Sequence, residues 1–140
     1  MTDRSPLPAS DIYNVDRWGD SYFRIDDQGQ LCVRPNGEQG GQATLEAVLE
    51  SCRAAGLRAP VLARFSGILR QRVKLLAGAF REAIEGHQYQ GDYTPVYPIK
   101  VNQQRRVVHE ILRARDEGEQ VGLEAGSKPE LLAVLALSNP

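Results

Sequence analysis

Hydrophobic positions along the chain change their spacing, and this change separates a β-rich beginning from a longer alternating region. Two short apolar runs at residues 22–25 and 31–33 flank the turn-forming sequence Asp-Asp-Gln-Gly, which predicts a β-hairpin. A polar, glycine-rich connector follows at residues 35–41. From Thr44 onward, apolar residues recur at helical spacing, and they predict a helix that stops at Gly56.

The rest of the chain alternates short apolar runs with amphipathic stretches. Strands are predicted at residues 61–65, 95–102 and 121–125, and helices at residues 66–86, 104–117 and from 128 onward. Ser127 and Glu130 form a capping box at the start of the last helix. Strand–helix alternation predicts a parallel sheet with right-handed crossovers, hence an α/β fold. The two alternatives are a small three-stranded open sheet and the start of a (β/α)8 barrel, which needs about 250 residues.

Composition narrows the class of protein further. The chain has 140 residues, of which 41% are hydrophobic and 25% charged, as in a globular protein outside the membrane. Lys and Arg number 17 against 18 Asp and Glu, which argues against a nucleic-acid or anionic-membrane partner. No apolar run approaches the roughly 20 residues of a membrane-spanning helix. We therefore expect a cytoplasmic protein.

Isolated cysteine, histidine and arginine side chains offer little chemistry. Cys32 and Cys52 lack any CxxC or Cys/His clustering, so we expect two buried, reduced cysteines rather than a disulfide or zinc site. His87 and His109 have no partner at a catalytic or metal-binding spacing, and we expect structural or exposed roles. Arg64 lies within a predicted strand and needs either a carboxylate partner or solvent, and of the two a structural ion pair is expected.

Lys100 is the strongest candidate for chemistry. It lies near the carboxyl end of the predicted strand 95–102, the place where parallel α/β folds collect functional groups. Strand alternation predicts that Pro98, Lys100 and Asn102 share one face. A desolvated lysine there could form a Schiff base with a carbonyl. The alternative, which spacing alone favours, is a strand-end lysine that extends to solvent.

Glu124 occupies the equivalent place one strand later. A carboxylate there could pair with the lysine and influence its protonation. It could equally stabilise the amino terminus of the helix that follows, and the residues alone leave both roles open.

Two segments and the front of the chain resemble a known family. Residues 97–104, Tyr-Pro-Ile-Lys-Val-Asn-Gln-Gln, are similar to the cofactor-lysine motif of the biosynthetic arginine decarboxylases. Residues 122–132 and the region from Tyr13 through residues 64–69 provide further matches. The resemblance implies a pyridoxal-phosphate enzyme on an alanine-racemase-like barrel. It assigns residues 1–41 to an N-terminal β-hairpin segment and linker, and residues 42–140 to the first three strand–helix units of an incomplete TIM-type barrel.

The same resemblance implies roles for individual residues. Lys100 would bind pyridoxal 5'-phosphate covalently, Glu124 would lie close to the cofactor and its lysine, and Pro98 would line the cofactor site. The implied reaction converts L-arginine to agmatine and CO2 in polyamine biosynthesis. Magnesium is implied as a second cofactor, although the sequence shows no convergent set of carboxylates. A homo-oligomer is implied for the full-length protein.

Proteins of this family are several times longer than this chain. Their phosphate-binding loop and substrate-selecting segment lie downstream of the matched region. We therefore expect an N-terminal fragment that is inactive alone. One alternative is a stand-alone, non-catalytic interaction or regulatory module. Another is a decarboxylase of a different basic amino acid, diaminopimelate or ornithine.

Overall fold

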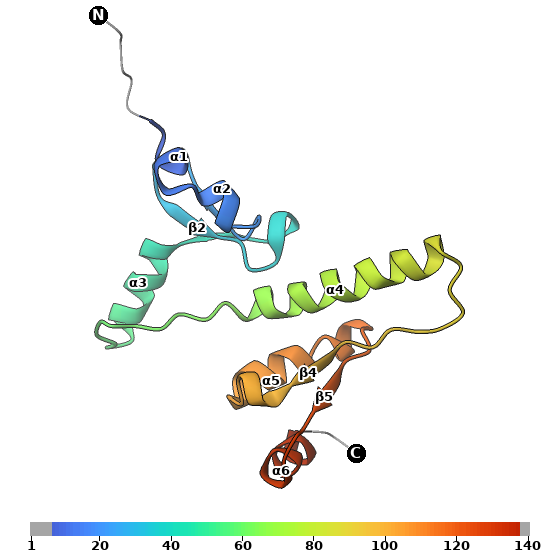
Figure 1. Cartoon of the computed structure of the whole chain (residues 1–140). Coiled ribbons are helices and arrows are strands. Elements are labelled where there is room, and N and C mark those ends of the chain that lie inside the picture. The colour runs from blue at the N-terminus through green and yellow to red at the C-terminus, as the bar shows by residue number, and fades with distance from the viewer. Residues whose placement is uncertain (1–6, 138–140) are drawn as a thin grey trace, which may run out of the picture. The chain divides into compact units, whose positions relative to one another are not determined.

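The computed structural model describes residues 7–137, which divide into two compact units (Figure 1). The first unit ends at Ile68 and the second begins at Leu69. Both contain helices and strands, so the predicted mixed α/β character of the chain is confirmed. The predicted boundary between residues 41 and 42 separates an N-terminal segment from the start of a barrel. The described residues do not establish a barrel, so this boundary stays a prediction.

The first unit is built around an antiparallel sheet of three strands in the order β1-β2-β3. The predicted hairpin is confirmed, because Phe23 pairs with Val33 and Ile25 pairs with Leu31. The buried side chains of this unit include Val15 of α2 and Cys32 of β2. The elements of this unit are α1 Ala9–Tyr13, α2 Val15–Trp18, β1 Phe23–Ile25, β2 Leu31–Val33, η1 Gly37–Gln39, β3 Ala43–Thr44 and α3 Leu45–Ala54.

Helix α3 begins and ends where the sequence predicts. The Thr44 hydroxyl accepts a hydrogen bond from the Ala47 amide at 3.1 Å, which satisfies one of the free donors of the first turn. After the helix, Gly56 adopts a φ of 75°, a left-handed conformation that glycine reaches without a steric penalty.

The strand predicted at residues 61–65 does not form. This segment has no regular structure, and Leu62 is 76% exposed. A short apolar run becomes a strand only when a neighbouring strand accepts its backbone hydrogen bonds, and no other strand of the described chain pairs with it. Arg64 is exposed and forms no ion pair with any described residue, so the predicted ion pair is also wrong.

The second unit contains the long helix and a parallel pair of strands. Val96 of β4 pairs with Gly122 of β5, and Pro98 pairs with Glu124, in parallel register. The predicted parallel sheet is therefore present with two strands instead of three, and this pair alone does not establish a barrel. The elements are α4 Ser66–Gly86, which begins at the end of the first unit, β4 Val96–Pro98, η2 Ile99–Val101, α5 Arg105–Leu112, η3 Arg115–Glu117, β5 Gly122–Glu124 and α6 Lys128–Leu137.

One apolar cluster holds the second unit together. Its buried members are Val107, Ile111, Ala114 and Val121. The first three recur at helical spacing, so one face of α5 and the turn after it supply most of the cluster. Partly buried side chains from α4 and β4 pack against these residues: Leu69, Val73 and Tyr97. The predicted helix 104–117 is interrupted after Leu112, and its last residues form the 3-10 turn η3.

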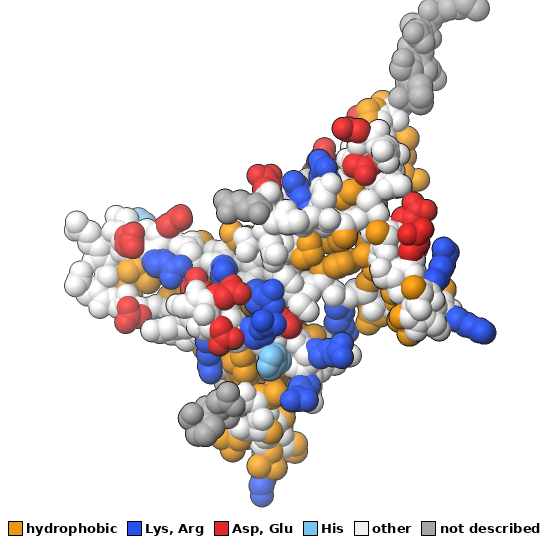
Figure 2. Space-filling view, turned by 180° about the vertical axis from the view of Figure 1, so that it is seen from behind, with side chains coloured by type: hydrophobic (Ala, Val, Ile, Leu, Met, Phe, Trp, Pro, Cys, Tyr) orange, Lys and Arg blue, Asp and Glu red, His pale blue; other side chains and the backbone are white. Residues whose placement is uncertain are grey.

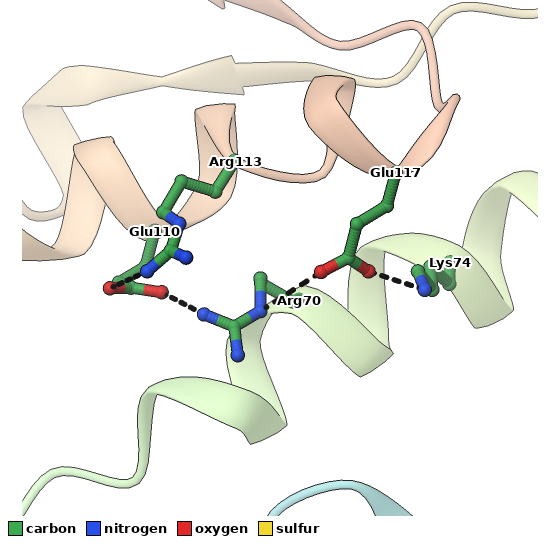
Figure 3. Close-up of polar contacts among 5 residues, drawn as sticks. All are labelled: Arg70, Lys74, Glu110, Arg113 and Glu117. Atoms are coloured by element: carbon green, nitrogen blue, oxygen red, sulfur yellow. Dashed lines mark hydrogen bonds and ion pairs between the residues drawn. The ribbon is translucent and has the colours of Figure 1, made fainter.

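Ion pairs join the polar edge of α4 to α5 and η3 (Figure 3). Arg70 contacts Glu110 and also approaches Glu117, with Nε to Oε1 at 3.4 Å. Lys74 pairs with the other oxygen of Glu117, and Arg113 flanks Glu110 at 3.5 Å. Because Glu110 and Glu117 each meet two cations, the group forms a network and does not consist of isolated surface pairs.

This network predicts how Glu117 titrates. The hydrogen bond from Lys74, aided by Arg70, holds the pKa of the Glu117 carboxyl below its ordinary value. A carboxyl with a lowered folded pKa stabilises the fold above its ordinary pKa and loses that contribution as the pH falls through the folded value. We expect Lys74→Met to raise the Glu117 midpoint in an NMR titration of the carboxyl carbon. Lys128→Met, a control at the start of α6, is expected to leave it unchanged, and an unchanged midpoint in Lys74→Met would contradict the assignment.

Several large apolar side chains remain exposed outside these cores. On the face seen in Figure 2, apolar side chains lie between interspersed acidic and basic ones. In the second unit, the exposed large apolar side chains include residues of β4, η2 and α6, with exposed fractions of 50% to 70%: Val96, Val101, Leu131, Leu132 and Leu135. Exposure of this extent on several elements of one unit is typical of a surface that other structure covers.

Candidate functional site

Lys100 lies in a short turn immediately after β4. The strand stops at Pro98, and Lys100 is the central residue of the 3-10 turn η2. Proline has no backbone N–H to give to a ladder, so Pro95 and Pro98 bound a strand much shorter than the predicted 95–102. The face predicted for Pro98, Lys100 and Asn102 from strand alternation is therefore wrong, because the backbone leaves the extended conformation at Ile99.

The structure nevertheless brings Lys100 and Glu124 together. The Lys100 Nζ lies 3.6 Å from the Glu124 Oε1. Glu124 ends β5 and pairs in register with Pro98 of β4, so the two charged side chains meet at the carboxyl ends of neighbouring parallel strands. This is the edge at which the sequence places them.

Both side chains of this pair are accessible to solvent. The Lys100 side chain is 62% exposed and the Glu124 side chain 43% exposed, so Lys100 is not desolvated in this chain. An ion pair with such exposure contributes about 0–1 kcal/mol to stability. Stability therefore gives little reason for placing an amine and a carboxylate here.

The second role considered for Glu124, stabilisation of the α6 amino terminus, is filled by other residues. The Ser127 hydroxyl accepts a hydrogen bond from the Glu130 amide at 3.4 Å. The Glu130 carboxylate accepts one from the Gly126 amide at 2.7 Å. These two contacts complete the predicted capping box, with the return bond reaching one residue further than usual. The structure thus favours the pairing of Glu124 with Lys100.

Two polar contacts that sequence reasoning missed lie around Lys100. The Tyr97 hydroxyl donates to the backbone carbonyl of Asn102 at 3.3 Å. The Asn102 Oδ1 accepts a hydrogen bond from the Gln104 amide at 3.0 Å. The available signal was the tyrosine itself, because a phenol whose ring packs on a core generally finds a partner for its hydroxyl.

The remaining sequence candidates lie away from this pair. Cys32 is buried and Cys52 half-buried, both as free thiols, so only Cys32 fully meets the expectation. Burial raises the pKa of the Cys32 thiol, which makes it a poor nucleophile. His87 and His109 are exposed, as expected. Within residues 7–137 no three His, Cys, Asp or Glu side chains gather as a metal site would require. Over the same residues, no helix has the length and apolar character needed to cross a bilayer.

A pocket of about 350 Å³ lies elsewhere in the second unit, before the starts of β4 and β5. Arg81 of α4 pairs there with Glu119, with Nη2 to Oε1 at 3.2 Å. Tyr93 lines the same pocket and stacks on Phe80 with ring centroids 3.7 Å apart. Lys100 and Glu124 lie at the other ends of the strands and do not line it, so the pocket is separate from the candidate site.

Comparison with known proteins relates the whole chain to one group. No protein-family model matches the chain. Biosynthetic arginine decarboxylases match it closely: that of Marinobacter nauticus is 47% identical over 99% of this chain. That of Xanthomonas campestris is 48% identical over 100% of the chain, and that of Vibrio vulnificus 51% identical over 90%. The chain spans about a fifth of the length of these curated relatives, between 20% and 22%.

A solved structure agrees with the sequence relatives. The crystal structure of the biosynthetic arginine decarboxylase from Campylobacter jejuni matches with a TM-score of 0.78 and 33% sequence identity. The match covers 91% of this chain and 20% of that protein. These similarities identify the chain as a homologue, over nearly its whole length, of the biosynthetic arginine decarboxylases.

Proposed function

We propose that this chain provides the cofactor-lysine region of a pyridoxal-phosphate-dependent arginine decarboxylase, with residues 42–140 forming the start of its TIM-type barrel. The substrate would be L-arginine and the products agmatine and CO2, for polyamine biosynthesis. One observation carries the proposal: a lysine amine lies beside a carboxylate at the carboxyl ends of parallel strands, in a chain about half identical to arginine decarboxylases.

The residues present fit a carbonyl-bearing cofactor. A primary amine that is 62% exposed is open to an aldehyde, and a carboxylate 3.6 Å away can hold the proton that the amine must lose before it attacks. Pyridoxal phosphate, when bound, supplies the electron sink that decarboxylation of an amino acid requires. We assign covalent attachment and proton transfer to Lys100, and the orientation of the Lys100 ammonium to Glu124. Pro98, which pairs with Glu124 in the sheet, would line the same site.

The resemblance to arginine decarboxylases adds three properties of the whole protein to this proposal. They are assembly into a homo-oligomer, a cytoplasmic location and a requirement for magnesium. The described residues do not fit a magnesium site, because no three suitable side chains gather among them. We therefore derive no step that uses the metal.

We expect the 140-residue chain to be inactive by itself. Decarboxylation depends on a site that excludes water and fixes the substrate, and the Lys100 and Glu124 side chains are both accessible to solvent. In the relatives, the regions that this chain does not span would close the site. The apolar side chains exposed on β4, η2 and α6 are a surface on which such regions could pack.

A chimaera tests this function directly. Residues 1–140 would replace the matching part of the Marinobacter nauticus enzyme, and CO2 release would be measured with arginine, ornithine and diaminopimelate. We expect release from arginine by the chimaera and none by the isolated chain. Because the substrate-selecting segment of the chimaera comes from the Marinobacter nauticus enzyme, this experiment tests the Lys100 region and not the choice of substrate. A folded chimaera with no activity on any of the three would instead favour a non-catalytic module.

A further inference from the structure

Two hydrogen bonds stabilise the turn that carries Lys100. On one side, the Tyr97 hydroxyl reaches across the turn to the Asn102 carbonyl at 3.3 Å. On the other, the Asn102 side chain accepts the Gln104 amide at 3.0 Å, just before α5 begins. An asparagine that bonds to the backbone two residues ahead stabilises a tight change of chain direction. The segment between β4 and α5 is thus held at its start and at its end.

The same turn is also anchored in the apolar core. The Tyr97 ring packs against the cluster of Val107, Ile111, Ala114 and Val121. Ile99, next to Lys100, is only 2% exposed. The Tyr97 hydroxyl therefore links a ring packed on the core to the backbone that follows Lys100. The packing of the ring thus constrains the position of the turn.

The contact between Lys100 and Glu124 cannot hold the lysine in place by itself. Both side chains are accessible to solvent, and such pairs contribute too little to fix two long, flexible side chains in one geometry. Among the described residues, the Lys100 amine has the Glu124 carboxylate as its polar partner. What brings the amine within reach of Glu124 is therefore mainly the position of the backbone that carries Lys100.

We propose that Tyr97 and Asn102 are positioning residues, which hold the Lys100 turn so that the amine lies beside Glu124. The importance of the Lys100 amine for catalysis rests on the proposed function. The hydrogen bonds that hold the turn do not depend on that function. Tyr97 acts through its hydroxyl on the Asn102 carbonyl, and Asn102 acts through its side chain on the Gln104 amide.

Carbodiimide coupling of the 140-residue chain measures this geometry without any enzymatic activity. The reagent joins a carboxylate to a neighbouring amine, and mass spectrometry quantifies the Lys100–Glu124 product. We expect Tyr97→Phe, which keeps the ring and removes the hydroxyl, to lower that product about fivefold, the effect of losing one neutral hydrogen bond. The Lys74–Glu117 pair in the same molecule is the reference, and its product is expected to stay constant.

Matched variants separate positioning from general damage. Tyr93→Phe removes a hydroxyl elsewhere in the same unit and is expected to leave the Lys100–Glu124 product unchanged. Asn102→Ala should lower the product and speed hydrogen exchange of the Gln104 amide. Asn102→Asp keeps the accepting oxygen and should restore both. An unchanged Lys100–Glu124 product in Tyr97→Phe would overturn the proposal. An equal loss of both cross-links would also overturn it, because the hydroxyl would then support the whole unit.

These measurements are independent of decarboxylation. If the chimaera is inactive but Tyr97→Phe loses only the Lys100–Glu124 product, the positioning stands and the proposed function fails. If the chimaera is active and the product is unaffected by Tyr97→Phe, the function stands and the positioning is wrong.

Discussion

Replacement of Lys100 by alanine is expected to abolish covalent cofactor binding in the chimaera and to lower its arginine decarboxylation by about a thousandfold or more. Under the proposed function, loss of this one amine removes both the point of attachment and a group placed to transfer protons. The structure puts the Lys100 amine 3.6 Å from Glu124, so no other described lysine is placed to substitute for it. The measurements are the visible absorbance of lysine-bound pyridoxal phosphate and the rate of CO2 release.

Lys128→Ala is the matched control, because the sequence has only three lysines and Lys74 is engaged in the ion-pair network. Lys128 is exposed at the start of α6, where its loss should leave absorbance and activity unchanged. Borohydride reduction followed by peptide mapping would locate the cofactor on Lys100 in the unmodified chimaera. Cofactor found on another residue, or normal absorbance in Lys100→Ala, would refute the assignment.

Local signals made much of the fold predictable. The hairpin follows from two apolar runs around a turn sequence, and these contacts involve residues close together in the chain. Helix α3 follows from apolar residues at helical spacing between Thr44 and Gly56, and α6 from the Ser127 and Glu130 capping box. Each of these features depends on interactions within a few residues, so the sequence contains the information directly.

Features that depend on distant partners were less predictable. Residues 61–65 have a strand-like composition, but a strand forms only if another segment pairs with it. The strand that precedes Lys100 is shortened because its prolines cannot complete a ladder, although the apolar run continues beyond them. The ion pair expected for Arg64 required a carboxylate from elsewhere, and no described carboxylate lies near enough.

The candidate site shows the same distinction. Lys100 and Glu124 could be placed together from sequence because the carboxyl ends of parallel strands meet at one edge, whatever the details of each strand. The Tyr97 ring packs on the apolar cluster, but the contact of its hydroxyl with Asn102 depends on the turn that replaces the strand. Packing decides local backbone geometry of this kind. The spacing of apolar residues along the sequence does not reveal it.

Substitution of Ile111 by alanine is expected to destabilise the second unit by about 2–5 kcal/mol, because it removes a buried side chain and leaves a cavity. Ile111 is only 5% exposed and contributes to the cluster that joins α5 to α4 and β4. The Arg113 amide, which donates to the His109 carbonyl at 2.9 Å, reports the opening of α5. We expect its hydrogen exchange to become at least about thirtyfold faster, which corresponds to the lower end of that range.

Leu131→Ala is the control, since Leu131 is 50% exposed on α6 and its loss creates no comparable cavity. Its effect on the Arg113 amide should stay within about twofold. Because Tyr97 packs on the same cluster, Ile111→Ala should also lower the Lys100–Glu124 cross-link, together with the Lys74–Glu117 reference. Tyr97→Phe should lower the first cross-link alone and leave the Arg113 amide protected. If Ile111→Ala leaves both cross-links intact, the core cannot be what positions the turn, and the hydroxyl of Tyr97 would have to act without it.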